Sequence, residues 1–237
     1  MHMVQPADQY STGRYYSGRQ RPRKPDLVPS GNDDKQVWRL ARSALICAGL
    51  VLATLCSTAS LARAIEPARL VTEARKQVGV TRSYDPVYRR LSYPGGDVPL
   101  ETGVCTDVVI RALRAQGLDL QRAVHEDMRS NFSVYPKHWG LSQPDPNIDH
   151  RRVPNLMTWF KRQGKQVQTG SQASDFRAGD IVAWDLGRGL THIGVVSDRR
   201  TAAGTPLILH NIGQGTREED ILFGYRIIGH YRYSAQR

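Results

Sequence analysis

The spacing of apolar residues changes along this chain, and the change predicts helices first and strands afterwards. A proline in the first turn and a glycine after the end delimit a helix over 66–78. Apolar residues recurring at helical spacing predict a second helix from Thr102 or Gly103 to about Gln116. A short helix is expected over 119–130, and another after Pro154. The first half of the folded part is therefore expected to be helical.

Four later segments are short, rich in β-branched or aromatic residues, and separated by Gly, Pro and Asp turn signals. They are "GDIVAWDL" (179–186), "THIGVVSD" (191–198), "TPLILHNIG" (205–213) and "YRIIGHYRY" (225–233). We expect them to form sequential antiparallel strands. Helices followed by a sheet predict an α+β domain.

The N-terminal part differs in composition from the rest of the 237 residues. Residues 1–43 are polar and rich in Arg, Pro, Gly and Ser, so we expect a disordered basic extension. The uncharged run 44–61 and the small-x-small triplet Ala62–Ala64 predict a signal peptide and its cleavage site over 44–64. An uncut inner-membrane anchor is the alternative, because 18 apolar residues just suffice to span a bilayer. Either way, the domain 65–237 is expected in the periplasm or cell envelope.

Charge narrows the choice of partners. The formal net charge is +11, and residues 1–64 hold 9 basic and 4 acidic residues, which leaves +6 on the remainder. That excess is dispersed, without a block of five or six like charges. It favours an anionic envelope polymer as partner, while no basic-aromatic module supports nucleic-acid binding. We expect a monomer.

Cysteine usage singles out one residue. Cys47 and Cys56 lie in the apolar run, so Cys105 is alone once that run is removed. A lone thiol in an oxidising compartment is either a reactive group or a buried small hydrophobe. Because Cys105 lies at a predicted helix start, backbone N–H groups and the helix dipole are expected to favour its thiolate. The same N–H groups point to where a tetrahedral oxyanion would form.

Two histidines suit a role beside this thiol. His192 opens one predicted strand and His210 ends the next, so a hairpin would place them side by side. We expect the helix to bring Cys105 to His192, with His210 holding the other imidazole nitrogen. The remaining histidines lack metal-site spacing, so we expect neither a metal nor a cofactor; they are His125, His138, His150 and His230.

These segments resemble known families. "YPGGDVPLETGVCTDVV" resembles the nucleophile segment of the NlpC/P60 cysteine peptidases, and the histidine-led strands follow that family's order. At a finer level, about residues 68–233 resemble the DUF1287 family. The motifs that carry this second resemblance are "GVCTDVVIRAL", "DHRRVPNLMTWF", "THIGVVSD" and "IIGHYRY".

The resemblance implies an NlpC/P60-like, papain-type fold and a set of roles. Cys105 would be the nucleophile, His192 the general base and acid, and His210 the orienting residue. Tyr93 and Thr106 would form the substrate-side and oxyanion environment. The usual Asp-Cys-Ser-Gly sequence is replaced here by Val-Cys-Thr-Asp, which leaves fine specificity open.

Other residues outside the proposed triad also have expected roles. Asp107 is expected to complement the helix dipole and not to act in catalysis. The "DHRRVPNLMTWF" segment could build a rim, with His150 as one polar rim residue, and loop 131–150 is expected to be a functional surface. Four aromatic residues could line a groove, although at least two of them are expected in the core: Tyr84, Tyr93, Trp139 and Trp159.

The predicted function is a periplasmic cysteine hydrolase that cleaves an amide bond, with peptidoglycan stem peptides as the substrate implied by the resemblance. Two alternatives stay open. One is an acyltransferase or thioesterase of the same fold acting on an envelope component, since fold does not fix the substrate. The other is a non-catalytic cell-wall binding module.

Overall fold

The computed structural model describes residues 64–234. The predicted disordered extension 1–43 and the signal or anchor run 44–61 lie outside this part. Within residues 64–234, the helices are too short or too polar to cross a membrane.

Four α-helices occur where the apolar spacing predicts them, except that the second begins at Cys105, because Thr102 and Gly103 form a short strand. They are α1 (Pro67–Arg75), α2 (Cys105–Arg114), α3 (Leu120–Asn131) and α4 (Val153–Arg162). Three short 3-10 turns accompany them: η1 (Phe132–Val134), η2 (Asp149–Arg151) and η3 (Ala173–Asp175). Loop 131–150 is thus largely irregular, as expected.

The strands make one five-stranded antiparallel sheet and one small parallel ladder. The sheet has the order β6-β5-β4-β3-β7, and the ladder joins β1 to β2. The bounds are β1 (Ser83–Tyr84), β2 (Thr102–Gly103), β3 (Ile181–Gly187), β4 (Leu190–Arg200), β5 (Pro206–Asn211), β6 (Thr216–Glu219) and β7 (Arg226–Tyr231).

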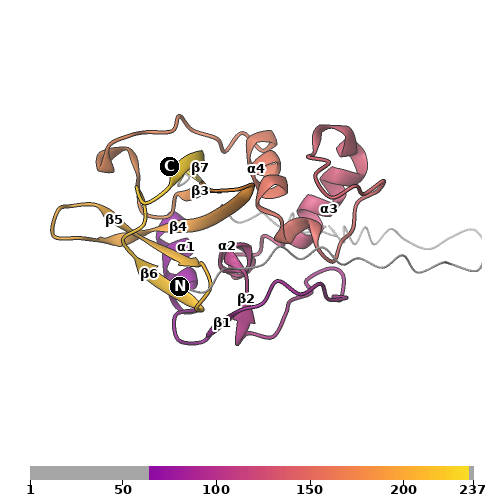
Figure 1. Cartoon of the computed structure of the whole chain (residues 1–237), viewed down its shortest axis with the longest axis horizontal. Helices are drawn as coiled ribbons and strands as arrows, with labels where there is room; N and C mark the ends of the chain where they lie inside the picture. The colour runs from indigo at the N-terminus through magenta and orange to yellow at the C-terminus, as the bar shows by residue number, and fades with distance from the viewer. Residues whose placement is uncertain (1–63, 235–237) are drawn as a thin grey trace, which may run out of the picture. The chain divides into compact units, whose positions relative to one another are not determined.

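The four predicted strands are confirmed as β3, β4, β5 and β7, but two details differ. Strand β7 does not extend a simple meander: it returns across the molecule and pairs with β3 (Figure 1). The edge strand β6 was not expected, because its sequence "TREE" is polar and edge strands need little apolar surface. The α+β class holds.

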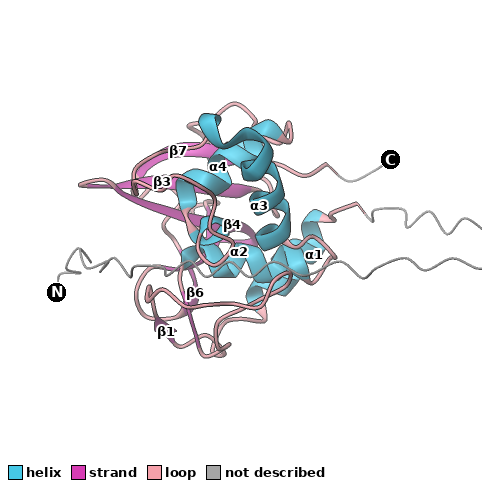
Figure 2. Cartoon of the chain, turned by 90° about the vertical axis from the view of Figure 1, so that its right-hand side faces the viewer, coloured by secondary structure: helices cyan, strands magenta, loops and turns pink. Residues whose placement is uncertain are grey.

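Helices cover one face of the sheet (Figure 2). Alternate residues of the strands point to opposite faces, so Ile181 and Ala183 of β3 and Ile193 and Val195 of β4 pack with the helices in the main core. Burial of these side chains contributes most of the stability of such a fold.

The other face carries a smaller apolar cluster made by the intervening positions. Its members are Phe176, Val182, Trp184, Val196, Ile208 and Leu222. By the same alternation, His192 and His210 share this side of the sheet, while Cys105 belongs to the main core. Cys105 and His192, the candidate nucleophile and base, therefore lie on different sides of the sheet, near the start of β4.

Candidate active site

Cys105 is the first residue of α2 and is 4% exposed. Three backbone N–H groups face its sulfur: that of Ile193 on β4, that of Thr106, and its own. The first N–H groups of a helix have no partner within the helix, so they are available to a thiolate or an oxyanion. The expected placement of the thiol at a helix start, against the sheet, is thus observed.

The ionisation of this thiol does not follow the sequence-based expectation. Burial raises the pKa of Cys105 to about 12, against an ordinary value of 9.0. The Ile193 N–H group opposes this rise, Asp107 adds to it, and the two first-turn N–H groups oppose it more weakly. Loss of solvation disfavours the charged form more than the helix start favours it. Cys105 is therefore a neutral thiol at pH 7 in this geometry.

A buried ion pair fixes the start of α2. Asp107 accepts a hydrogen bond from the Val104 N–H group at 2.7 Å and binds Arg151 through both carboxylate oxygens, at 3.1 and 2.9 Å. Both side chains are buried. The Thr106 hydroxyl donates to the Arg151 carbonyl at 3.1 Å. Thr106 therefore faces the sulfur with its backbone N–H group and not with its hydroxyl. Asp107 thus caps the helix, as expected, and has a structural partner that the sequence did not indicate.

A second tie joins the helix start to the end of β5. The Asn211 side-chain amide donates to the Gly103 carbonyl at 3.1 Å and to the Ser83 carbonyl at 3.3 Å. Asn211 directly follows His210, and Gly103 lies two residues before Cys105. The histidine strand and the thiol helix are thereby held together through the small β1–β2 ladder.

The two histidines lie side by side, as the hairpin predicts. His192 Nε2 is 3.1 Å from His210 Nδ1, with the rings nearly perpendicular at 84°. Both residues are buried, and the Trp184 ring lies 5.7 Å from that of His192. Gly194 permits this close approach, since a Cβ there would come within 2.7 Å of Ile208 Cγ2.

The Cys105 thiol lies next to the β4 backbone, one residue along from His192. Among the hydrogen bonds of residues 64–234, none links Cys105 to His192; the thiol meets the N–H group of the next residue, Ile193. Burial, and then His210, lowers the pKa of His192 to about 3. Because both groups are neutral, the geometry contains no preformed thiolate–imidazolium pair.

Cys105 opens onto a cavity of about 230 Å³. The walls are mainly apolar, with two arginines, and come from five parts of the chain: β1 and the residues after it, the start of α2, loop 131–150, the start of α4 with the residues before it, and the β3–β4 turn with the start of β4. They are Tyr84, Pro86, Val104, Cys105, Trp139, Ile148, Arg151, Arg152, Val153, Pro154, Gly189, Leu190 and Thr191. The "DHRRVP" segment and the loop therefore do border the thiol. The Arg152 guanidinium lies 4.1 Å over the Trp139 ring.

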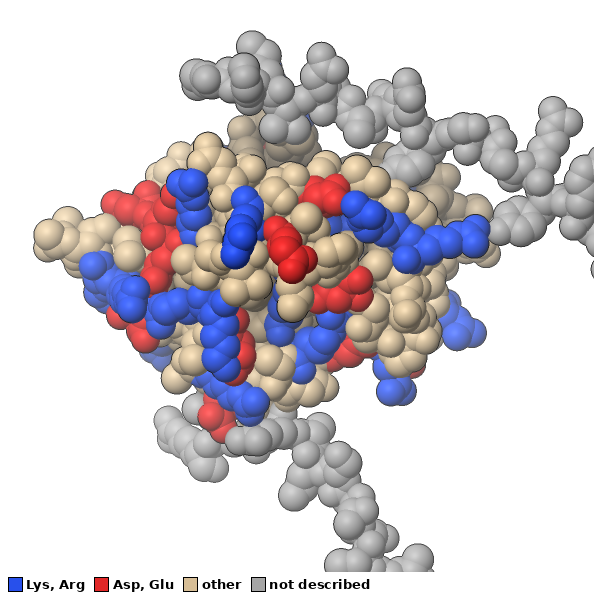
Figure 3. Space-filling view, turned by 90° about the horizontal axis from the view of Figure 1, so that it is seen from below, with Lys and Arg blue, Asp and Glu red and all other residues tan. Residues whose placement is uncertain are grey.

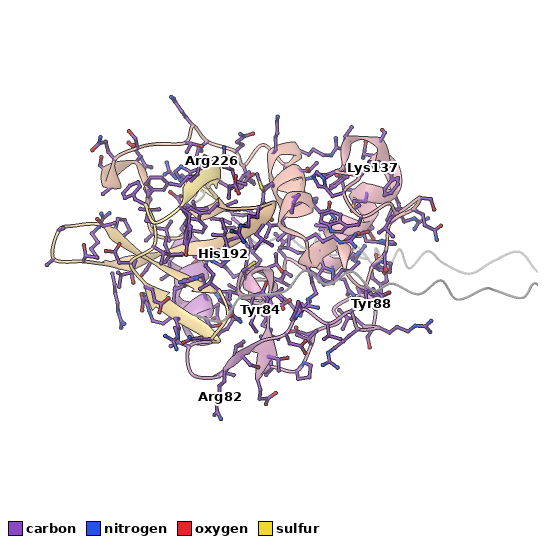
Figure 4. All side chains as sticks on the ribbon, viewed as in Figure 1. Arg82, Tyr84, Tyr88, Lys137, His192 and Arg226 are labelled. Atoms are coloured by element: carbon purple, nitrogen blue, oxygen red, sulfur yellow. The ribbon has the colours of Figure 1, made fainter. Side chains whose placement is uncertain are left out.

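Tyr84, and not Tyr93, accompanies the thiol. Tyr84 lines the cavity, and burial, followed by the negative charge that Cys105 would carry if ionised, raises the pKa of its hydroxyl well above 10.0. Figure 4 places Tyr84 and His192 in the central region where α2 meets the sheet. Tyr93 is 44% exposed, lines no part of this cavity, and contacts the His125 ring at 5.3 Å. The expected position of Tyr93 beside the thiol is thus corrected.

Two further expectations change. His150 is buried, at 2% exposed, and burial lowers its pKa to about 3, so it is no rim residue. At least two of the four candidate groove aromatics were expected in the core, but of the four Trp159 alone belongs to it, while Tyr84 and Trp139 line the cavity.

Glu219 is a neighbour of the histidine pair that the sequence did not reveal. It lies on β6 with Oε2 3.2 Å from His210 Nε2. Its segment reads as a polar turn, and only the pairing of β6 with β5 brings it to His210. Among residues 64–234, no group of three or more His, Cys, Asp or Glu side chains is arranged to hold a metal ion.

The surface charge is mixed on the face drawn in Figure 3. Lys and Arg side chains lie close to Asp and Glu there, without one large patch of a single sign. Close ion pairs also occur among the described surface residues, such as Arg89 with Asp85 at 2.8 Å.

Comparison with known proteins shows which family and which proteins this chain is similar to. The model of the DUF1287 family, described as a domain of unknown function, matches residues 71–233. The "Uncharacterized protein YijF" of Escherichia coli K12 is 62% identical over 160 residues, which are 68% of this chain and 78% of that protein. The solved structure of NlpC1 from Trichomonas vaginalis gives a TM-score of 0.40 at 14% identity, over 74% of this chain and 48% of that one.

The match to the family model includes α2, which begins with Cys105, and strands β4 and β5, which carry His192 and His210. It covers well over half of the chain, and the similarity to YijF is far above the level at which family membership is in doubt. The chain therefore belongs to the DUF1287 family, as its motifs predict.

Proposed function

We propose that this protein is a cysteine hydrolase that cleaves an amide bond through an acyl-thioester on Cys105, on an NlpC/P60-like, papain-type fold. One observation carries the proposal. Within residues 64–234, Cys105 is a lone buried thiol at a helix start; it faces three backbone N–H groups, lines a cavity, and abuts β4, the strand that carries His192 of the histidine pair. A purely structural cysteine has no need of this combination.

The proposed reaction has two steps. The Cys105 sulfur attacks the carbonyl carbon while its proton passes to His192 Nδ1; the C–N bond then breaks as His192 returns the proton to the leaving amine. Water next attacks the thioester carbon and gives its proton to His192. The acid product leaves, and the sulfur regains its proton from His192. Overall, one water is consumed for each amide cleaved.

In the proposed mechanism the Cys105 thiol loses its proton during the attack step and not before it. The raised pKa of Cys105 and the lowered pKa of His192 favour the neutral pair before substrate binds. We propose that a bound substrate brings the His192 imidazole and the thiol into hydrogen-bonding contact, since apo geometry is often looser than that of the productive complex.

Backbone N–H groups and one hydroxyl would stabilise the oxyanion. The N–H groups of Cys105 and Thr106 already face the sulfur, within reach of an oxygen on the attacked carbon. The Tyr84 hydroxyl keeps its proton at neutral pH and lines the same cavity, so we assign it the role first expected of Tyr93.

The substrate proposed is a peptidoglycan stem peptide. The export signal predicted over 44–64 would deliver the domain to the periplasm or cell envelope, where this polymer lies, and the moderate positive charge suits an anionic partner. An uncut signal would add inner-membrane association. The bond cleaved depends on which part of the peptide enters the cavity.

The apolar cavity wall supports a second candidate, an acyltransferase or thioesterase acting on an envelope component. Pro86, Val104, Ile148, Val153 and Leu190 would suit a hydrocarbon chain as well as a peptide side chain. A covalent acyl-Cys105 that passes to an amine or alcohol, not to water, would distinguish this reaction from hydrolysis.

Digestion of purified peptidoglycan tests the proposal. The full chain, its Cys105→Ala variant and a matched Cys56→Ala control are incubated with the polymer, and released fragments are identified by mass spectrometry. We expect fragments from wild type and Cys56→Ala only, and their masses identify the bond. Equal release by Cys105→Ala would contradict the thiol mechanism. Binding by all three proteins with no product from any would favour a non-catalytic binding module.

A further inference from the structure

The histidine pair continues to a third group on the edge strand. His192 Nε2 lies 3.1 Å from His210 Nδ1, and His210 Nε2 lies 3.2 Å from Glu219 Oε2. The last contact is at ion-pair distance and is less well aligned than a full hydrogen bond. His210 is fully buried, whereas the Glu219 side chain is 36% exposed. The row therefore runs from the interior of the site to the surface of β6.

The register of the sheet builds this row. Strand β5 pairs with β4 on one side and with β6 on the other, so His210 stands between the strands that carry the other two groups. The charged or titratable groups facing His210 are His192 from β4 and Glu219 and Arg217 from β6. Burial lowers the pKa of His210, Glu219 opposes that change, and Arg217 adds to it.

The order of donors and acceptors follows from the one group that can only accept. An ionised carboxylate has no proton to donate, so favourable contact with Glu219 requires the His210 proton to be on Nε2. His210 Nδ1 then presents a lone pair, and His192 must carry its own proton on Nε2. His192 Nδ1 is left unprotonated, which is the state a base needs to accept the Cys105 proton.

We propose that Glu219 is a positioning residue that fixes the tautomers of His210 and His192, so that His192 Nδ1 is free to act as base. The inference rests on the proposed function for its purpose, but the tautomers themselves exist whether or not the protein is an enzyme. Without Glu219, either tautomer of His210 satisfies the contact with His192, and the reverse arrangement would place the His192 proton on Nδ1.

The experiment is a measurement of histidine tautomers by ¹⁵N NMR on the full chain, with signals assigned through His192→Gln and His210→Gln. The variants are Glu219→Ala and Glu219→Gln, and the matched control is Asp220→Asn, which removes the neighbouring exposed negative charge. In wild type and control we expect the Nε2–H tautomer at both histidines. Glu219→Ala should shift His210 toward a mixture of tautomers, and Glu219→Gln, which keeps an acceptor oxygen, should restore the wild-type state.

Unchanged tautomers in Glu219→Ala, or an Nδ1–H tautomer of His192 in wild type, would overturn the inference. Loss of the folded amide spectrum is checked first, and Glu219→Gln keeps the test open if the alanine variant unfolds. Failure of wild type to digest peptidoglycan, with tautomers that still depend on Glu219, would reject the proposed function and leave the positioning role standing.

Discussion

At the scale of single residues, burial controls the chemistry of this site. Cys105 and His192 are both nearly inaccessible, and burial shifts their pKa values in the directions that disfavour charge, up for the thiol and down for the imidazole. The N–H groups at the helix start lower the pKa of Cys105, but by less than burial raises it. A neutral pair is also protected from adventitious oxidation, which proceeds through the thiolate.

Thiol alkylation measures this protection. In a chain with Cys47→Ala and Cys56→Ala, a Cys105 pKa of about 12 leaves about one thiol in 10⁵ ionised at pH 7. We expect iodoacetamide to react with native Cys105 at least about tenfold more slowly than with the same chain unfolded in urea. A native rate at pH 7 equal to that of the unfolded chain would show that the thiol is not suppressed.

The pH dependence of stability tests the histidine. The pKa of His192 is about 3 when folded and 6.5 ordinarily, so the unfolded chain takes up the proton first as the pH falls. Stability from the neutral imidazole is complete above pH 6.5 and is lost progressively toward pH 3. Between pH 7 and 5 we expect wild type to lose about 2 kcal/mol more than His192→Gln.

Urea unfolding at the two pH values gives this difference, and comparing two proteins cancels other groups such as Asp149. His138→Gln, on the exposed loop, serves as the surface control. Identical losses in wild type and His192→Gln would mean that the imidazole titrates normally in the folded protein.

At the scale of elements, the site depends on how α2 is held against the sheet. The Asp107–Arg151 pair, the Thr106 hydroxyl and the Asn211 amide each fix the first turn of this helix. Their effect is to hold Cys105 at one position against the backbone of β4.

Breaking the buried ion pair should be costly. Arg151→Ala leaves the Asp107 carboxylate buried without its partner, and we expect a loss of about 3–5 kcal/mol in the free energy of unfolding. The comparison is Arg122→Ala, which removes an exposed pair with Glu126 and should have no measurable effect. Equal effects of the two substitutions in urea unfolding would contradict the structural role assigned to Arg151.

The glycine between the histidine strands gives a further test. A Cβ at Gly194 would lie 2.7 Å from Ile208 Cγ2 and 3.0 Å from the Leu209 carbonyl oxygen. We expect Gly194→Ala to destabilise the protein by about 1–3 kcal/mol. At Gly224 the nearest atom is 3.3 Å away, so Gly224→Ala is the milder control. If thermal or urea unfolding shows the two variants to be equally stable, the strands are not packed as closely as the structure indicates.

The sequence predicted the elements in which the pattern of apolar residues reflects which side chains are buried. Strands β3, β4, β5 and β7 are recognisable because they are rich in β-branched and aromatic residues, and the pairing of β4 with β5 brought His192 and His210 together as expected. Strand β6 escaped, since an edge strand needs no apolar pattern. Tyr84 and Tyr93 could not be told apart, because the path of the loop before Cys105 depends on tertiary contacts. The pKa of the thiol likewise depends on burial, which no motif encodes.

At the scale of the whole molecule, the site lies where the two sides of the sheet meet. Helices cover one face and the histidine pair belongs to the other, and Cys105 meets the backbone of β4 at Ile193, the residue after His192. The cavity that Cys105 lines is walled by five separate parts of the chain. We expect its shape, set by loop 131–150 and the segment before α4, to decide which substrate is accepted.

The central claim is that Cys105 forms a covalent bond with the substrate, and intact mass measurement tests it most directly. Wild type, Cys105→Ala and Cys56→Ala are mixed with purified peptidoglycan stem peptides and quenched in acid within the first turnover, and the adduct is located by digestion. The account predicts a mass increase equal to the acyl part of the peptide, on the segment containing Cys105, in wild type and Cys56→Ala only. Peptide cleavage without any adduct at Cys105, or with Cys105→Ala still active, would contradict it.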